Sequence, residues 1–209
     1  TVKPELERTK EKLVGLKNQV SQLALLKKQV ELTASTQEQQ NQSQALEKKS
    51  QVNQARENLE AKKSNYNLQK LEKKAQVERA KQQIKIFENE QQSAQNRLFI
   101  DSKQLERFSK LITDGAVSAA QVDRLKKDQQ ESKRLYEKAA LDIKQAELSL
   151  AEEFNRYLTT MNQLESDIEQ AKLRLQEQKS SYQSAVNTGE IAVLKTQEQL
   201  KDLQRQINS

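Results

Sequence analysis

The apolar residues of this chain recur at alternating spacings of three and four residues over most of its length. That spacing is typical of the seam along which two α-helices pair in a coiled coil. In the first half the seam residues are Val52, Leu59, Tyr66, Lys73, Val77, Ala80, Ile84, Phe87, Gln91, Ala94, Leu98, Asp101, Leu105, Phe108 and Ile112. The pattern predicts long paired helices.

The seam resumes in the second half. It follows Val122, Leu125, Gln129, Ser132, Tyr136, Ala139, Ile143, Ala146 and Leu150. We expect it then to advance four residues to Phe154 and to continue through Tyr157, Met161, Leu164, Ile168, Ala171, Leu175 and Tyr182. A step of that kind is a stutter, which unwinds a supercoil locally. Because many seam residues are polar or small, each helix alone is marginal and pairing must stabilise both.

The composition excludes a compact globular core of normal size. Charged residues make up 32% of the chain, apolar residues 34% and aromatic residues 4%, and there is no Trp. Such a chain is either disordered or a thin helical assembly. Only three Gly and one Pro, with an abundance of good helix formers, favour the helical assembly.

Several functional classes are excluded or disfavoured. The chain has no Cys and no His, which excludes thiol catalysis, a histidine base and a Cys/His zinc site. Its many carboxylates have no pocket-forming sequence around them, so we expect no enzyme, no cofactor and no metal site. No apolar run approaches the roughly 20 residues that cross a bilayer, and no signal peptide is visible. Because it starts and ends abruptly, we interpret the sequence as an excised fragment.

The N-terminal part has a seam of its own, formed by Leu6, Leu13, Leu16, Val20, Leu23 and Val30. Pro4 fits the first turn of a helix, so we expect a helix over residues 4–32. The following stretch TASTQEQQNQSQ, residues 33–44, has almost no apolar content. Its Ser and Thr side chains compete for backbone hydrogen bonds. We expect a linker or joint there, with a continuous, solvated helix as the alternative.

One stretch near the middle carries the signals of a chain reversal. Gly115 suits the left-handed conformation that ends a helix. Ser118 is a good N-cap with Gln121 as its capping-box partner, and Val117 and Val122 are spaced as a hydrophobic staple. The chain should therefore reverse within about five residues. We predict an all-α fold, a long antiparallel coiled-coil helical hairpin with an additional N-terminal helix.

The reversal sets a register. Paired residues should have numbers that add up to about 232. The second candidate break, NTGE at residues 187–190, then lies level with the polar stretch, so the arms should be about 68 residues long, or ~100 Å. The predicted divisions are 4–32, N-terminal helix; 33–44, linker or joint; 45–112, ascending helix; 113–118, tip; 119–187, descending helix; and 190–207, terminal helical segment.

The tip resembles that of a known family. Arg107, Leu111 and Ser118 lie in RFSKLITDGAVS, followed by AAQVD. This spacing is similar to the hairpin-tip pattern of HlyD-type membrane fusion proteins, also called periplasmic adaptors. The detailed match covers about 20 residues around the turn, and the hairpin architecture extends it over most of the chain. The resemblance implies partner-binding roles for Arg107, Leu111 and Ser118, and a turn that includes Asp114, Gly115 and Val117.

The resemblance also implies a function. Adaptors of this family bridge an inner-membrane transporter and a TolC-like outer-membrane channel, which the tip contacts, and several copies form a tube. The long arms look more like those of adaptors in ABC-driven type I secretion. The expected location is the periplasm, with the parent protein anchored in the inner membrane of a Gram-negative-type cell. The lipoyl-like domain, β-barrel and membrane helix of the family are missing from this sequence, as expected of an isolated hairpin.

Two other functions fit parts of the sequence. The heptads suit a generic structural arm of a scaffold or chromosome-organising protein, which needs a turn but no Arg–Leu–Ser spacing. The net charge of +6 and pI near 9.3 are typical of nucleic-acid binding. However, aromatic residues are scarce, and the predicted register places residues 63–85, with net charge +5, beside residues 147–169, with net charge −5. We therefore expect no nucleic-acid partner.

The three tip residues also have plain structural interpretations. Ser118 caps a helix whether or not it contacts a partner. Leu111 can pack inside the hairpin, although the seam already has Ile112 at this level. The side chain of Arg107 can simply be solvated.

Overall fold

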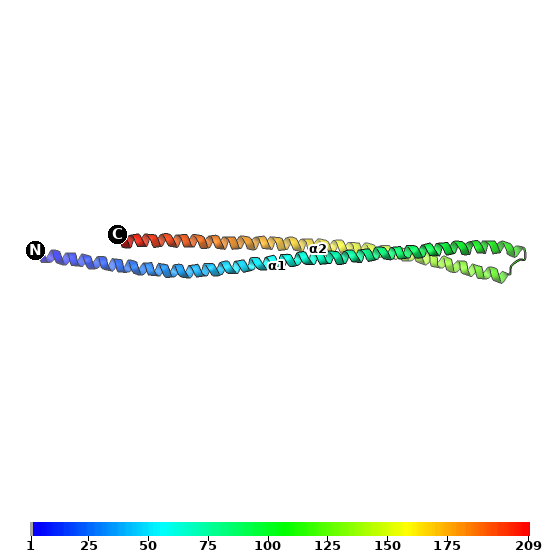
Figure 1. Ribbon diagram of the computed structural model, residues 1–209, viewed down its shortest axis with the longest axis horizontal. Coiled ribbons are helices and arrows are strands. Elements are labelled where there is room, and N and C mark those ends of the chain that lie inside the picture. Colours follow the sequence, from blue (N-terminus) through cyan, green and yellow to red (C-terminus); the bar gives the residue numbers. More distant parts are fainter. Residues whose placement is uncertain (1) are drawn as a thin grey trace. The chain divides into compact units, whose positions relative to one another are not determined.

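The computed structural model describes residues 2–209. They form two helices, α1 (Val2–Thr113) and α2 (Ala119–Asn208), joined by a short turn (Figure 1). The two helices pack against each other, and the described residues contain no strand. The predicted all-α antiparallel hairpin is therefore confirmed.

The paired helices divide into two units. The tip unit comprises Lys62–Asp167 and contains the turn, and the base unit comprises the residues up to Ala61 and from Ile168 onward. No helix along residues 2–209 is long and apolar enough to cross a membrane.

Cross-helix hydrogen bonds fix the register of the tip unit. The Tyr66 hydroxyl donates to a carboxylate oxygen of Glu165 at 3.3 Å. Nearer the turn, the side-chain amide of Gln129 donates to Ser102 Oγ at 3.2 Å. The residue numbers of both pairs add up to 231. The predicted register of about 232 is confirmed in this unit.

The core of the tip unit is a single narrow seam of buried, mostly small side chains: Val77, Val122, Ser132, Ala139, Ala146 and Met161. Every seam position predicted in α2 from Val122 to Leu150 is buried or half-buried. Because the seam is narrow, most of the surface of both helices stays in solvent.

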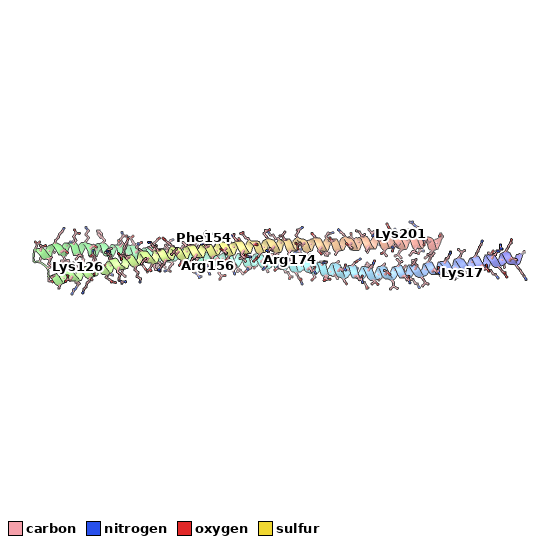
Figure 2. The ribbon with its side chains drawn as sticks, turned by 180° about the vertical axis from the view of Figure 1, so that it is seen from behind. Lys17, Lys126, Phe154, Arg156, Arg174 and Lys201 are labelled. Carbon is pink, nitrogen blue, oxygen red and sulfur yellow. The ribbon has the colours of Figure 1, made fainter. Side chains whose placement is uncertain are left out.

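The predicted stutter is displaced along α2. Phe154 was expected in the seam, but 48% of its surface is exposed, while Glu153 is half-buried in its place. The stutter lies further along α2 instead. There the seam takes two four-residue steps in a row, from Glu153 to Tyr157 and from Tyr157 to Met161. The Phe154 ring stacks on Tyr157, with centroids 6.4 Å apart, so its apolar surface is partly covered without entering the seam. Figure 2 labels Phe154 on α2.

The base unit has the same register. Lys27 Nζ donates to the side-chain oxygen of Gln204 at 2.5 Å. A Cβ atom on Gly189 would lie 3.5 Å from Cβ of Asn41. The buried apolar residues of this unit are Val52, Ala55, Leu59 and Ala171.

The break predicted at residues 33–44 is wrong, because α1 is continuous through it and through the expected N-terminal helix. Likewise, α2 is continuous through residues 187–190 into the expected terminal segment. The hydroxyls of Thr33 and Thr36 donate to the carbonyls of Gln29 and Leu32, at 2.9 and 3.0 Å, so they are satisfied inside the helix. The low apolar content therefore indicates a solvated part of a paired helix.

Candidate functional site: the hairpin tip

A Schellman motif ends α1. The amide of Ala116 donates to the carbonyl of Leu111, and the amide of Gly115 donates to the carbonyl of Ile112, both at 3.2 Å. The Asp114 amide also donates to the Leu111 carbonyl at 3.2 Å. Gly115 has φ of +75°, the left-handed conformation predicted for it. The carbonyls of Leu111 and Ile112 are thus satisfied without a partner protein.

A capping box begins α2. The amide of Gln121 donates to Ser118 Oγ at 3.3 Å, and the amide of Ser118 donates back to Gln121 Oε1 at 3.1 Å. Val117 is half-buried and Val122 is buried, as their staple spacing predicts. Both ends of the turn are therefore fixed by local hydrogen bonds.

Arg107 lies on the exposed side of α1, two turns before the helix ends. The neighbouring acid, Glu106, instead forms an ion pair with Lys110 at 3.8 Å. Among the described residues none forms an ion pair with Arg107, and the adjacent Phe108 is the one that turns toward the seam. The guanidinium donors of Arg107 therefore face solvent.

The seam assignment at the end of α1 needs a correction. Ile112 was expected in the seam and Leu111 outside it, but Ile112 is 37% exposed and Leu111 is half-buried. The seam advances three residues from Phe108 to Leu111 in the last turn, where the Schellman bonds tighten the backbone. A partner at the tip would therefore meet both side chains.

Ser118 is exposed, and its oxygen accepts the capping hydrogen bond. The hydroxyl proton remains available to an outside acceptor. Ser118 thus has a demonstrated structural role and one free donor.

A polar layer crosses the seam about three turns from the tip turn. Ser132 is 2% exposed and donates a hydrogen bond to the carboxylate of Asp101. The Gln129–Ser102 bond lies directly beside it. Asp101, Gln129 and Ser132 all lie in the seam pattern. A register near 232 places Ser132 opposite Asp101, so this bond could have been predicted by combining the seam pattern with the register.

A charged cluster lies next to this layer. Arg134 holds Glu131 through two hydrogen bonds of 2.6 and 3.1 Å. The hydrogen bond from Arg134 is the main reason that the pKa of the Glu131 carboxyl is lowered, and the charge of Arg97 on α1 lowers this pKa further. The pKa of Arg134 is raised by the same hydrogen bond.

The tip presents a fixed reversal with an exposed guanidinium, two apolar side chains and a hydroxyl. These groups suit contact with another protein. In the described part of the chain no cluster of three or more acidic side chains could hold a metal ion. Comparisons of the chain with family models, with curated proteins and with solved structures found no match.

Proposed function

We propose that the hairpin is the periplasmic adaptor arm of a tripartite export system, and that its tip docks on a TolC-like outer-membrane channel. The observation that carries the proposal is the solvent-facing Arg107 beside a doubly capped reversal that has the adaptor family's Arg–Leu–Ser spacing. A generic coiled-coil arm needs the reversal but does not need the Arg–Leu–Ser spacing around it.

The chemistry of the tip suits docking on the rim of a channel. The planar guanidinium of Arg107 offers hydrogen-bond donors that fit carboxylate and carbonyl oxygens. Such oxygens would be present at the helix ends on the rim of the channel. Ser118 adds a donor, and Leu111 with Ile112 adds apolar surface. Because the turn is already ordered by its caps, little conformational entropy is lost on docking.

The remaining parts of the proposal follow from the same resemblance. The helices are 112 and 90 residues long, which fits the long arms of type I secretion adaptors that serve ABC transporters. The parent protein would be anchored in the inner membrane of a Gram-negative-type cell, and several copies would line a periplasmic tube.

An export assay with the parent protein tests this function. Arg107→Asp should abolish export, because the guanidinium is replaced by a carboxylate that repels acceptor oxygens. Lys126→Asp is the matched control, since Lys126 is an exposed cation of α2 close to the turn (Figure 2). Far-ultraviolet circular dichroism should show unchanged helicity in both variants. Normal export by Arg107→Asp would remove the docking role of this residue.

The other two tip residues need variants that separate docking from folding. Leu111→Asp should abolish export, but Leu111 is half-buried, so its thermal unfolding must be measured alongside. Ser118→Asp keeps an N-cap acceptor, whereas Ser118→Ala loses it. A docking role predicts that Ser118→Asp exports poorly although its stability is close to that of the unmodified protein.

A further inference from the structure

A second arginine lies level with Arg107 on the other helix of the tip unit. The residue numbers of Arg107 and Arg124 add up to 231, as do those of the two cross-helix hydrogen-bonded pairs of this unit. Both arginine side chains are exposed. The two guanidinium groups are therefore carried by facing turns of α1 and α2, and the axes of helices that pack in this way lie about 8–10 Å apart.

The heptad pattern places both arginines on the same face of the hairpin. Each arginine directly precedes a half-buried seam residue of its helix. The row of Arg107 passes through Ser93, two heptads nearer the N-terminus. The row of Arg124 passes through Lys138, two heptads nearer the C-terminus. Because Ser93 and Lys138 line one groove between the helices, the two rows border the same face.

Leu111 lies on this face as well. It follows Arg97 and Gln104 at heptad spacing, and Arg97 lines the same groove. We define the arginine face as Gln104, Arg107, Leu111 and Arg124. On this face a half-buried leucine thus lies beside two exposed cations.

The hairpin itself does not neutralise these two arginines. In the described part of the chain neither Arg107 nor Arg124 forms an ion pair. Glu131, in the row of Arg124, is held by Arg134 instead, and Asp128 in the adjoining row forms no ion pair among residues 2–209. Two like charges at one level do not stabilise the pairing of the helices. Both guanidinium groups are therefore available to an acceptor outside the hairpin.

We propose that the hairpin meets the channel with its arginine face, and that Arg124 is a second docking residue beside Arg107. Asp or Glu side chains of the channel bind the two guanidinium groups, and an apolar side chain of the channel packs on Leu111. Guanidinium groups suit this role because each can form two parallel hydrogen bonds with a carboxylate. This inference rests on the proposed export function, and it adds the face that docks and the chemistry of its partner.

Charge reversal in the parent protein tests the role of Arg124. Arg124→Asp should lower export at least about tenfold, because a carboxylate would then face the carboxylates of the channel. Lys126→Asp is the matched control, since Lys126 is an exposed cation two residues further along α2 (Figure 2). Lys126 directly follows the seam residue Leu125, which places it on the opposite face, so Lys126→Asp should keep export within about twofold. Circular dichroism should show the same helicity and thermal unfolding for both variants, because both positions are exposed.

Photo-cross-linking in the working exporter identifies the docking face while both arginines stay in place. A photoreactive amino acid replaces Gln104 on the arginine face or, as the control, Ser109. Ser109 directly follows the seam residue Phe108 and therefore lies on the opposite face, and both replaced side chains are exposed. We expect cross-links to the channel from Gln104 and none from Ser109.

Several results would overturn the inference while tip docking stands. These are loss of export in Arg107→Asp but not in Arg124→Asp, equal loss in Arg124→Asp and Lys126→Asp, and cross-links to the channel from Ser109 alone or equally from both positions. Cross-links from Gln104 to a second copy of the adaptor in place of the channel would also overturn it. If neither arginine variant changes export and neither position cross-links to the channel, the proposed function fails as well.

Discussion

At the scale of single residues, the turn depends on backbone geometry that only a few side chains tolerate. Gly115 has φ of +75°, and open space surrounds the position that its Cβ would occupy. A substitution there is therefore strained by the backbone alone. The sequence could predict this position, together with Ser118 and Gln121, because a cap is defined by residues at most a few positions apart.

We predict that Gly115→Ala lowers the free energy of unfolding by about 1–2 kcal/mol, because Ala is unfavourable in the left-handed region. Gly115→Asn should cost less, since Asn tolerates that conformation. Urea unfolding followed by circular dichroism measures both changes. Equal stability of Gly115→Ala and the unmodified chain would show that the turn does not keep its left-handed residue in solution.

The Glu131–Arg134 pair predicts a pH dependence with a defined sign. The pKa of Glu131 is lowered from its ordinary value of 4.5, so folding favours the ionised carboxylate. Its contribution to stability is present above pH 4.5 and is lost as the pH falls through the lowered folded-state pKa. Carbon-detected NMR should find a lower pKa for Glu131 than in Arg134→Gln. The same pKa in both proteins would exclude a lasting hydrogen bond.

At the scale of the helices, periodicity predicted the seam well and its irregularities poorly. A heptad pattern identifies the buried row because each position repeats the same environment. The stutter is displaced along α2, and Leu111 takes the seam position that was expected for Ile112. Both depend on how side chains of the facing helix fill the space, and the apolar pattern of one helix carries no information about that. The Asp101–Ser132 bond was missed for the same reason, since it requires both the pattern and the register.

The stutter provides a paired test of the seam. Met161 is 5% exposed and Phe154 is 48% exposed. We therefore predict that Met161→Ala lowers the free energy of unfolding by roughly 2 kcal/mol, whereas Phe154→Ala costs less than about 1 kcal/mol. Thermal unfolding of the two variants measures the difference. If Phe154→Ala lowers the free energy of unfolding more than Met161→Ala does, Phe154 lies in the seam as the sequence pattern predicted.

At the scale of the whole molecule, the register places the most basic stretch beside an acidic one. The Tyr66–Glu165 hydrogen bond joins the basic stretch 63–85 to the acidic stretch 147–169, as predicted. Ion pairs such as Lys81–Glu78 and Arg156–Glu153 lie within single helices. The register therefore brings the net charge of +5 in the basic stretch close to the net charge of −5 in the acidic stretch.

We accordingly predict weak binding of duplex DNA at physiological salt. Non-specific binders at that salt have dissociation constants of about 10⁻⁴–10⁻⁶ M, and this chain should lie at the weak end of the range or beyond it. A mobility-shift titration with a fluorescent duplex measures this affinity. Binding at nanomolar concentration would make a nucleic-acid function the better account.

Docking by the tip is tested most directly by site-specific photo-cross-linking in the working exporter. A photoreactive amino acid would replace the exposed Lys110 or Ile112 at the tip, and Lys17 or Lys201 near the base would serve as controls (Figure 2). We expect cross-links to the outer-membrane channel from the two tip positions and none from the base positions. Cross-links to the channel from the base alone, or from no position while export proceeds normally, would show that the tip does not dock on the channel.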